Sequence, residues 1–377
     1  MKKCLKIVAD DKIPFLRGVF EDVARVVYLP GAKTAAADVR DADALITRTR
    51  TRCGRELLAG SSVRFIATAT IGFDHIDREA LRELGIAWCN APGCNAASVA
   101  QYITSALVSF PGSRQGQVLG VIGVGHVGRL VAAAGRALGM EVLLNDPPRE
   151  EAGDPEHFVS LDEIREKSDF ITLHVPLERE GAHPTLKMLS AAFFAGVKSG
   201  AVFFNSSRGE AVETSALKAA LRGGRLAAAV IDVWENEPGI DTELMALARF
   251  ATPHIAGYST DGKANGTAMS VRRVAAALEL PGFDGWYPAS IPAPEAPEII
   301  RLDASESVAG QVRQAVLHAY DISCDDRRLR AAPEDFEKLR GSYPVRREFP
   351  FFRVRGGSPE ALKILTSLGF SADGGER

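Results

Sequence analysis

The chain has 377 residues, of which 46% are hydrophobic and 25% are charged, and its formal net charge is -3. This composition is that of a globular protein with a full core, and the length suggests two or three domains at about 150 residues each. A slightly acidic chain with a pI near 6.2 has no general attraction for polyanions, which argues against nucleic acid as the main partner.

The sequence pattern indicates no signal peptide, no membrane span and no cysteine arrangement for disulfides or zinc. The opening residues, MKKCLKIVADD, run directly into a strand-like segment without the apolar core of a signal peptide. No apolar run reaches the roughly 18 residues that a membrane span needs. The five cysteines are scattered without a CxxC pair, which indicates reduced thiols and neither a disulfide framework nor a zinc site. We therefore expect a cytoplasmic protein with no membrane partner and no metal.

In the first third of the chain, short apolar segments alternate with amphipathic ones, which is typical of parallel α/β architecture. A helix is predicted over 77–85, where Gly85 follows the last periodic residue as a C-cap does. A longer helix is predicted from a cap at Asn95 to Phe110. The predicted strands lie at residues 5–10, 26–29, 44–47, 64–68 and 86–90.

The stretch ITRTRTRC, from Ile46 to Cys53, alternates threonine and arginine directly after a predicted strand. If the strand continued, Arg48, Arg50 and Arg52 would share one face. The stretch could be part of a socket for a phosphorylated small molecule or a solvated edge that discourages pairing with another sheet. A nucleic-acid stripe is the third interpretation, and the acidic net charge disfavours it.

A second α/β series follows. Its predicted strands lie at residues 117–123, 141–146, 170–175, 201–206 and 226–234. The helix before the third of these begins with a capping box formed by Ser160 and Glu163. After Pro253 another long helical pattern ends near Leu280.

The last part of the chain is separated by a proline-rich link, residues 281–298, whose proline density resists regular structure. Beyond it the pattern predicts a helix over 307–320, a strand over 348–356 and a helix over 359–369. These elements describe a small α+β unit.

A dinucleotide-binding fingerprint lies in the second series, where Gly123-x-Gly125-x-x-Gly128 follows a strand and opens a helix. The glycines allow a tight turn and close approach of the pyrophosphate, and the helix N-terminus attracts the phosphates. Asp146, 18 residues beyond Gly128, stands where an acidic residue binds the adenine ribose. Its carboxylate would repel a 2′-phosphate, so NAD is favoured over NADP even though Arg149 is close. The alternative is a purely structural glycine turn.

Three polar residues follow strand ends, where ligands bind in open α/β sheets: Arg208, Glu237 and His254. Oxidation of a 2-hydroxy acid needs these chemical groups. Guanidinium holds a carboxylate with fixed geometry, histidine accepts the hydroxyl proton near neutral pH, and a carboxylate orients the imidazole. Taken singly, each has an ordinary interpretation as a surface or turn residue.

The segments GVIGVGHVGR, NSSRGE, DVWENEP and TPHIAGY resemble the D-isomer-specific 2-hydroxyacid dehydrogenase family. Other segments, including ATATIGFDHID, APGCNA and HIAGYSTDGKANGT, extend the resemblance over the whole chain. It implies a Rossmann-type NAD domain, a flavodoxin-like substrate domain and a small C-terminal α+β dimerisation domain. The implied boundaries are 1–93 with 257–280 for the substrate-binding domain, 94–256 for the NAD-binding domain, 281–298 for the linker and 299–377 for the dimerisation domain.

The resemblance also implies roles for single residues. Arg208, Glu237 and His254 become the catalytic set. The implied substrate contacts are Thr49, which replaces a serine, with Thr70 and Tyr258. Because Arg208 can bind only one anionic group of a phosphorylated hydroxy acid, either Arg48 or Arg50 belongs to a phosphate socket or the stretch is a solvated edge. His174 is either packed in the core or close to the cofactor. The implied cofactor contacts are Gly123, Gly125, His126, Val127, Gly128, Asp146, Val175, Ser206, Ser207, Asp232 and Gly257.

The implied activity is NAD-dependent oxidation of a small phosphorylated 2-hydroxy acid, 4-phospho-D-erythronate, to (R)-3-hydroxy-2-oxo-4-phosphooxybutanoate in pyridoxal 5′-phosphate biosynthesis, by a homodimer. One alternative is another D-2-hydroxyacid dehydrogenase, for instance one acting on 3-phosphoglycerate. A second alternative is a non-catalytic NAD-sensing protein, which would have no need of all three catalytic side chains.

Overall fold

The computed structural model describes residues 5–372, so the prediction for the first residues, Cys4 included, lies outside the described range. The chain divides into two compact units, the first formed by residues 1–95 and 260–292 and the second by residues 96–259 and 293–377. The first boundary lies at the start of a long helix, and the last lies in the proline-rich link.

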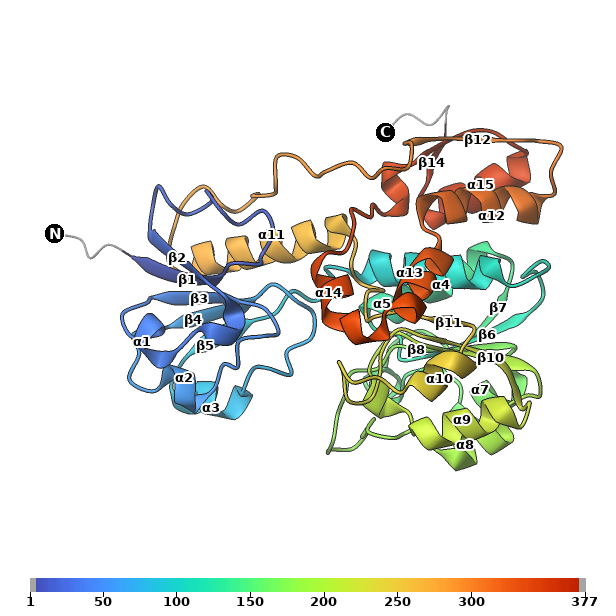
Figure 1. The fold of residues 1–377 in the computed structure, drawn as a ribbon, viewed down its shortest axis with the longest axis horizontal. Helices are drawn as coiled ribbons and strands as arrows, with labels where there is room; N and C mark the ends of the chain where they lie inside the picture. Colours follow the sequence, from blue (N-terminus) through green and yellow to red (C-terminus); the bar gives the residue numbers. More distant parts are fainter. Residues whose placement is uncertain (1–4, 373–377) are drawn as a thin grey trace. The chain divides into compact units, whose positions relative to one another are not determined.

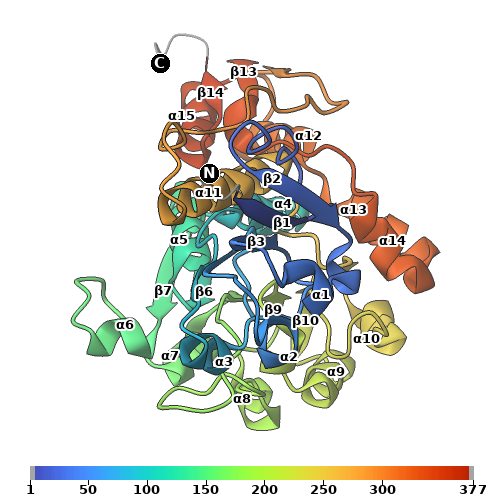
Figure 2. The ribbon, with the colours of Figure 1, turned by 90° about the vertical axis from the view of Figure 1, so that its left-hand side faces the viewer.

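The first unit is built on a five-stranded parallel sheet with the order β2-β1-β3-β4-β5, which is the flavodoxin-like order that the resemblance implied. Alternate residues of each strand are buried on opposite faces. Helix α11 covers one face and the three short helices cover the other (Figure 1; Figure 2). The strands are β1 (Lys6–Asp10), β2 (Arg25–Leu29), β3 (Ala44–Thr47), β4 (Phe65–Thr68) and β5 (Ala87–Cys89). The helices are α1 (Ala36–Val39), α2 (Arg55–Leu58), α3 (Arg78–Glu83) and α11 (Thr260–Ala277).

The second unit contains a six-stranded parallel sheet with the order β11-β10-β9-β8-β6-β7. Beyond β7, Leu144 forms a single parallel bridge with Phe158, which takes the place of the third strand of a Rossmann sheet. The strand order reverses between β6 and β8, and this switch point is where such sheets bind ligands. The strands are β6 (Val118–Ile122), β7 (Glu141–Asn145), β8 (Phe170–Leu173), β9 (Ala201–Asn205), β10 (Leu226–Ile231) and β11 (Phe250–Ala251).

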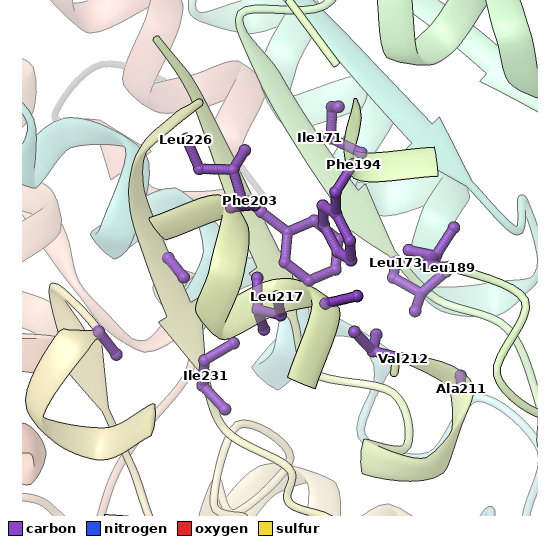
Figure 3. Packing of buried hydrophobic residues seen from close by; sticks show 14 of the residues in the cluster. Ile171, Leu173, Leu189, Phe194, Phe203, Ala211, Val212, Leu217, Leu226 and Ile231 are labelled. Atoms are coloured by element: carbon purple, nitrogen blue, oxygen red, sulfur yellow. The ribbon is translucent and has the colours of Figure 1, made fainter. Parts of the chain in front are cut away.

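Helices cover both faces of this sheet. Below it, in the view of Figure 1, α7 to α10 pack on a core centred on Phe203, shown in Figure 3, while α4 and α5 pack on the other face. Burial on both faces explains why the strands are apolar throughout. The helices are α4 (Ala96–Ser109), α5 (His126–Ala137), α6 (Pro147–Glu151), α7 (Leu161–Lys167), α8 (Ala191–Gly196), α9 (Thr214–Arg222) and α10 (Thr242–Leu247).

The end of the chain forms a three-stranded parallel sheet in the order β12-β13-β14. The strand predicted over 348–356 is wrong in its first half, because Phe349–Phe351 forms a 3₁₀ turn and only Arg353–Gly356 pairs. Pro350 lies in this turn and has no N–H to donate to a ladder. The elements are β12 (Ile299–Leu302), α12 (Val308–Ala319), α13 (Ile322–Ala331), α14 (Phe336–Gly341), β13 (Arg353–Gly356), α15 (Pro359–Leu368) and β14 (Ser371–Ala372).

The segment between α12 and β13 does not belong to this small sheet alone. Tyr320 and Ile322 are buried in the same core as Tyr102 of α4, and Leu329 and Phe336 are buried in the core shown in Figure 3. Residues 320–348 therefore complete the core of the NAD-type domain. None of the helices in the described range is both long and apolar enough to span a membrane.

Candidate active site

The glycine fingerprint forms the turn between β6 and α5, at the switch point of the sheet. Gly123 has a φ of +83°, and a Cβ there would lie 2.8 Å from the backbone of His174. A Cβ on Gly128 would lie 2.0 Å from the carbonyl oxygen of Gly123. At Gly125, in contrast, nothing in the described structure lies within 4 Å of the Cβ position. The first and third glycines therefore close the turn, and the second leaves its outer side open to a ligand.

The N-terminus of α5 faces this open side, because Gly125 is its N-cap and provides no side-chain cap. The first amides of the helix, at His126 and Val127, therefore remain available for phosphate oxygens. His126 is exposed and Val127 is half-buried. This is the geometry that a pyrophosphate requires.

Asp146, at the end of β7, is tied to the glycine turn. Its Oδ2 accepts a hydrogen bond from the amide of Val124 at 2.7 Å, and its Oδ1 accepts one from the amide of Arg149 at 3.2 Å. The guanidinium of Arg149 pairs with Asp154 and donates to the carbonyl of Val124. Because a carboxylate already engages Arg149, this cation is not offered to a 2′-phosphate, in agreement with a preference for NAD.

Two polar atoms at the ends of β8 and β9 are buried without a hydrogen-bond partner in the described structure: Nδ1 of His174 and Oγ of Ser206. Burial lowers the pKa of His174 to about 3, so its imidazole is neutral, and its Nε2 shares a hydrogen bond with Thr172 at 2.8 Å. Unpartnered buried polar groups are costly and need an explanation. A dinucleotide bound along this edge would supply the missing partners, and Val175 lies beside the same turn, with Cγ1 3.0 Å from a Cβ on Gly123.

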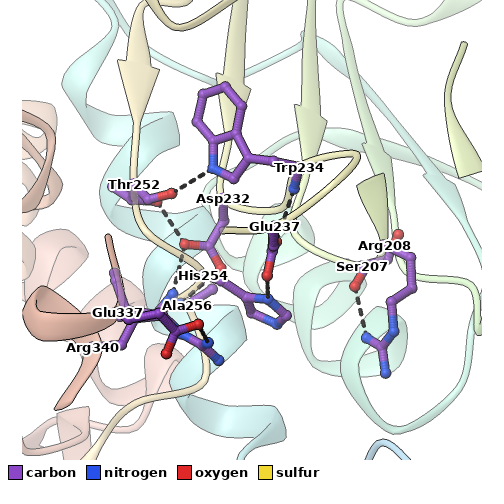
Figure 4. A network of polar contacts seen from close by, with 11 residues as sticks. Ser207, Arg208, Asp232, Trp234, Glu237, Thr252, His254, Ala256, Glu337 and Arg340 are labelled. Carbon is purple, nitrogen blue, oxygen red and sulfur yellow. Dashed lines mark hydrogen bonds and ion pairs between the residues drawn. The ribbon is translucent and has the colours of Figure 1, made fainter. Parts of the chain in front are cut away.

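The structure brings His254 and Glu237 together. Nδ1 of His254 lies 2.8 Å from Oε2 of Glu237, and Oε1 of Glu237 accepts a hydrogen bond from the amide of Trp234 at 2.9 Å (Figure 4). His254 adopts a left-handed backbone conformation with a φ of +55°, and Asn236 does so at +66°. Such conformations cost of order 1–3 kcal/mol and gather at functional sites.

The electrostatics of this pair favour an ionised carboxylate. Burial raises the pKa of Glu237, but the hydrogen bond and charge of His254, the amide of Trp234 and the charge of Arg340 outweigh it, so the pKa lies below its usual range. An ionised Glu237 that accepts from Nδ1–H leaves the lone pair on Nε2 of His254 for another proton. One third of the His254 side chain is exposed, so Nε2 can reach a substrate.

Asp232 holds the loop that carries the histidine. Its Oδ1 accepts hydrogen bonds from the hydroxyl of Thr252 at 2.6 Å and the amide of Ile255 at 2.8 Å, and its Oδ2 accepts one from the amide of Ala256 at 2.9 Å. The carboxylate is 1% exposed, and this burial raises its pKa. The three bonds fix the backbone on both sides of His254, and Gly257 follows directly.

Arg208 follows β9, the strand next to β10. Its Nη1 donates to the carbonyl of Ser207 at 2.8 Å, and the side-chain Nδ2 of Asn205 donates to the Arg208 carbonyl at 3.0 Å. A Cβ at Gly209 would lie 2.1 Å from the backbone of Trp234, so the arginine loop packs closely against the glutamate loop. The three catalytic candidates thus follow neighbouring strands of one sheet (Figure 4).

Sequence reasoning missed the support that residues 320–348, called the C-terminal segment below, give to the loop that carries His254. Arg346 is 4% exposed and donates to the carbonyls of Ile255 and Ala256, to the carbonyl of Ser98 at 2.6 Å and to Oε1 of Gln101 at 2.8 Å. Its guanidinium also lies 3.7 Å from the ring centroid of Tyr320. Oγ of Ser259 donates to Glu348 at 2.7 Å.

No local signal could have revealed these contacts, because the partners are 89 to 248 residues apart in the sequence and a charged run is usually solvated. The catalytic loop is therefore held from one side by Asp232 and from the other by the C-terminal segment.

The substrate candidates of the first unit lie at the carboxyl ends of β3 and β4, which are neighbours in the sheet. Thr70 follows β4 and donates to the carbonyl of Gly72 at 2.9 Å. Thr49 is exposed in the loop after β3.

The prediction that the three arginines share one face of a strand is wrong, because β3 ends at Thr47 and the following residues form a turn. Arg48 is half-buried and donates to the carbonyl of Lys12 at 3.0 Å, while Arg50 and Arg52 are exposed.

Comparison with known proteins gives the following matches. A model described as the D-isomer specific 2-hydroxyacid dehydrogenase, NAD binding domain, matches residues 100–256, and a domain of unknown function matches residues 291–369. The erythronate-4-phosphate dehydrogenase of Bacteroides fragilis is 49% identical over 355 residues, which are 93% of this chain and 99% of the relative. That of Porphyromonas gingivalis is 42% identical over 97% of this chain and 100% of the relative.

Among solved structures, the D-lactate dehydrogenase of Aquifex aeolicus, complexed with NAD and lactic acid, is similar with a TM-score of 0.62 and 26% identity. The match covers 76% of this chain and 100% of that chain.

Proposed function

Because the chain belongs to the D-isomer specific 2-hydroxyacid dehydrogenase family, we propose that it oxidises 4-phospho-D-erythronate to (R)-3-hydroxy-2-oxo-4-phosphooxybutanoate with reduction of NAD. The relatives named erythronate-4-phosphate dehydrogenase match almost the full chain and support this substrate. The reaction belongs to the synthesis of vitamin B6. The observation that carries the proposal is the 2.8 Å contact between Nδ1 of His254 and Glu237, next to a complete dinucleotide turn.

The side chains of the site divide the chemistry between them. Nε2 of His254 takes the proton of the C2 hydroxyl, while Glu237 holds Nδ1–H and stabilises the imidazolium that forms. The hydrogen on C2 leaves as hydride, and the electrons of the O–H bond form the carbonyl. Arg208 binds the substrate carboxylate and the developing carbonyl oxygen through its fixed fork of donors. Bound NAD supplies the hydride acceptor.

The remaining assignments extend this proposal to binding residues. Thr49, Thr70 and Tyr258 contact the substrate, and Arg48 or Arg50 binds its phosphate. Asp232 and Gly257 place the histidine loop against the cofactor. The proposed cofactor contacts are Gly123, Gly125, His126, Val127, Gly128, Asp146, Val175, Ser206, Ser207, Asp232 and Gly257.

The function is tested by following NAD reduction with a panel of hydroxy acids. We expect the highest kcat/KM for 4-phospho-D-erythronate, a lower value for 3-phospho-D-glycerate and none for the L-isomers. A preference for 3-phospho-D-glycerate would instead assign the chain to another D-2-hydroxyacid dehydrogenase, one that acts on that substrate. NAD binding without oxidation of any D-hydroxy acid would favour the NAD-sensing alternative.

We also propose that the chain is a cytoplasmic homodimer and that the C-terminal domain, residues 299–377, forms the interface. Ile299 on the edge strand β12 is 37% exposed, and an exposed apolar residue on the edge strand of a sheet suits an interface. The full chain should sediment at twice its monomer mass of 40.4 kDa. Ile299→Asp should shift it toward the monomer, whereas Leu130→Asp, at a site on α5 that is 42% exposed, should not. A monomeric full chain contradicts the proposal.

A further inference from the structure

A second arginine of the C-terminal segment, Arg340, lies beside the catalytic residues without a full set of partners. It belongs to α14, and its guanidinium carbon lies 5.5 Å from the ring centroid of Tyr258 and 5.8 Å from that of Phe336. Its Nη1 donates to Glu337 at 3.3 Å, a long hydrogen bond. Figure 4 shows Arg340 and Glu337 on the side of the histidine loop that faces α14.

The positive charge of Arg340 interacts electrostatically with the carboxylates of the active site. Burial lowers its pKa, but the nearby Tyr258, Glu337, Glu237 and Asp232 together raise it, so the group is a permanent cation close to the catalytic carboxylates. Only 18% of the side chain is exposed, and its Nε is buried without a hydrogen-bond partner in the described structure. A buried guanidinium with an unused donor is a costly arrangement unless a ligand completes it.

The neighbouring Arg346 uses its donors differently. Arg346 of the same segment uses Nε, Nη1 and Nη2 as donors to the backbone and to Gln101, and is fully occupied by its structural function. Arg340 makes one long contact to a carboxylate that is itself 39% exposed. Arg340 therefore keeps donor capacity that Arg346 does not have.

The proposed substrate carries two anionic groups. Arg208 binds the carboxylate, and the phosphate has three acceptor oxygens, which leaves room for a second cation beside Arg48 or Arg50. We propose that Arg340 binds a phosphate oxygen of the substrate, with the ring of Tyr258 as the surface that orients the guanidinium. Arg340 is then a specificity-determining residue for phosphorylated substrates, added to the dehydrogenase site by the C-terminal segment. This inference rests on the proposed function, because it assigns the phosphate of that same substrate.

The test compares Arg340→Met, which keeps the length of the side chain and removes the charge, with Arg340→Lys, which keeps the charge. Arg327→Met, at an exposed position on α13, is the matched control. For Arg340→Met we expect kcat/KM for 4-phospho-D-erythronate to fall about 10- to 150-fold, mainly through KM, which corresponds to about 1.4 to 3 kcal/mol. The loss on D-erythronate should be much smaller, Arg340→Lys should retain part of the preference, and the control should resemble the wild type.

Equal losses on both substrates, or no loss on either, overturn the inference. A second measurement separates it from the proposed function, because it needs no turnover. Inorganic phosphate should bind the NAD complex of the wild type in a calorimeter, and Arg340→Met should weaken that binding at least tenfold. Unchanged phosphate binding overturns the inference, whereas a wild type that binds phosphate but does not oxidise 4-phospho-D-erythronate contradicts the proposed function alone.

Discussion

Replacing His254 by alanine is expected to lower turnover about 10²- to 10⁴-fold, the usual effect of removing a positioned general base. NAD binding should persist, because the loop is held by its backbone. The amide of His254 donates to the carbonyl of Asp232 at 2.7 Å, and the next two amides donate to the Asp232 carboxylate. The measurement is steady-state NAD reduction together with calorimetric binding of NAD.

Two further variants make this test sharper. His254→Asn tolerates the φ of +55° better than alanine does, so it separates loss of the base from backbone strain. It should be as inactive as His254→Ala. His157→Ala, at an exposed histidine of the same unit, should remain fully active. Near-normal turnover in either His254 variant would remove the histidine from the chemistry.

Replacing Glu237 by glutamine is expected to cost about 10³- to 10⁴-fold in turnover, as amide replacements of a histidine-orienting carboxylate do. The amide oxygen can still accept from the amide of Trp234, but the NH₂ group then donates to Nδ1 of His254. The ring proton is thereby placed on Nε2, where the substrate hydroxyl needs an acceptor. Glu235→Gln is the matched control, because that carboxylate accepts from Thr214 and does not contact the histidine.

The pH profile of the residual activity should move toward lower pH. The pKa of Glu237 lies below its usual range, so the carboxylate is ionised throughout the neutral range and stabilises a protonated imidazole. Without the carboxylate this stabilisation is lost, and the rising limb of oxidation should shift toward lower pH. For the same reason, the contribution of Glu237 to folding is present above the ordinary pKa of glutamate and is lost as pH falls through its lowered folded value. An unchanged profile would uncouple Glu237 from His254.

Much of the catalytic domain follows from local rules in the sequence. Gly123, Gly125 and Gly128 are recognisable because only glycine fits a turn in which a Cβ would lie 2.0–2.8 Å from backbone atoms, or in which a ligand must approach. Arg208, Glu237 and His254 are recognisable because each follows an apolar strand, and parallel strands end at one edge. The long helix predicted from Asn95 to Phe110 is confirmed as α4, since its apolar pattern is a local feature.

The features that sequence reasoning missed depend on distant parts of the chain. The alternation after Ile46 satisfies the strand pattern, yet the sheet partner of β3 pairs only as far as Thr47 and the arginines turn away. Arg346 belongs to a charged run that resembles a solvated surface, but it is buried against carbonyl groups about 90 residues earlier in the chain. The hydrophobic periodicity of a sequence shows which face of a helix or strand is buried. It does not show which distant loop packs on that face.

The most direct measurement follows the hydrogen that leaves C2. 4-Phospho-D-erythronate carrying deuterium at C2 is oxidised with NAD, and the reduced cofactor is analysed by mass spectrometry. We expect one deuterium in each reduced nicotinamide, because the C2 hydrogen leaves as hydride while His254 takes only the hydroxyl proton. Deuterium recovered in water, or reduced cofactor without label, would contradict the account.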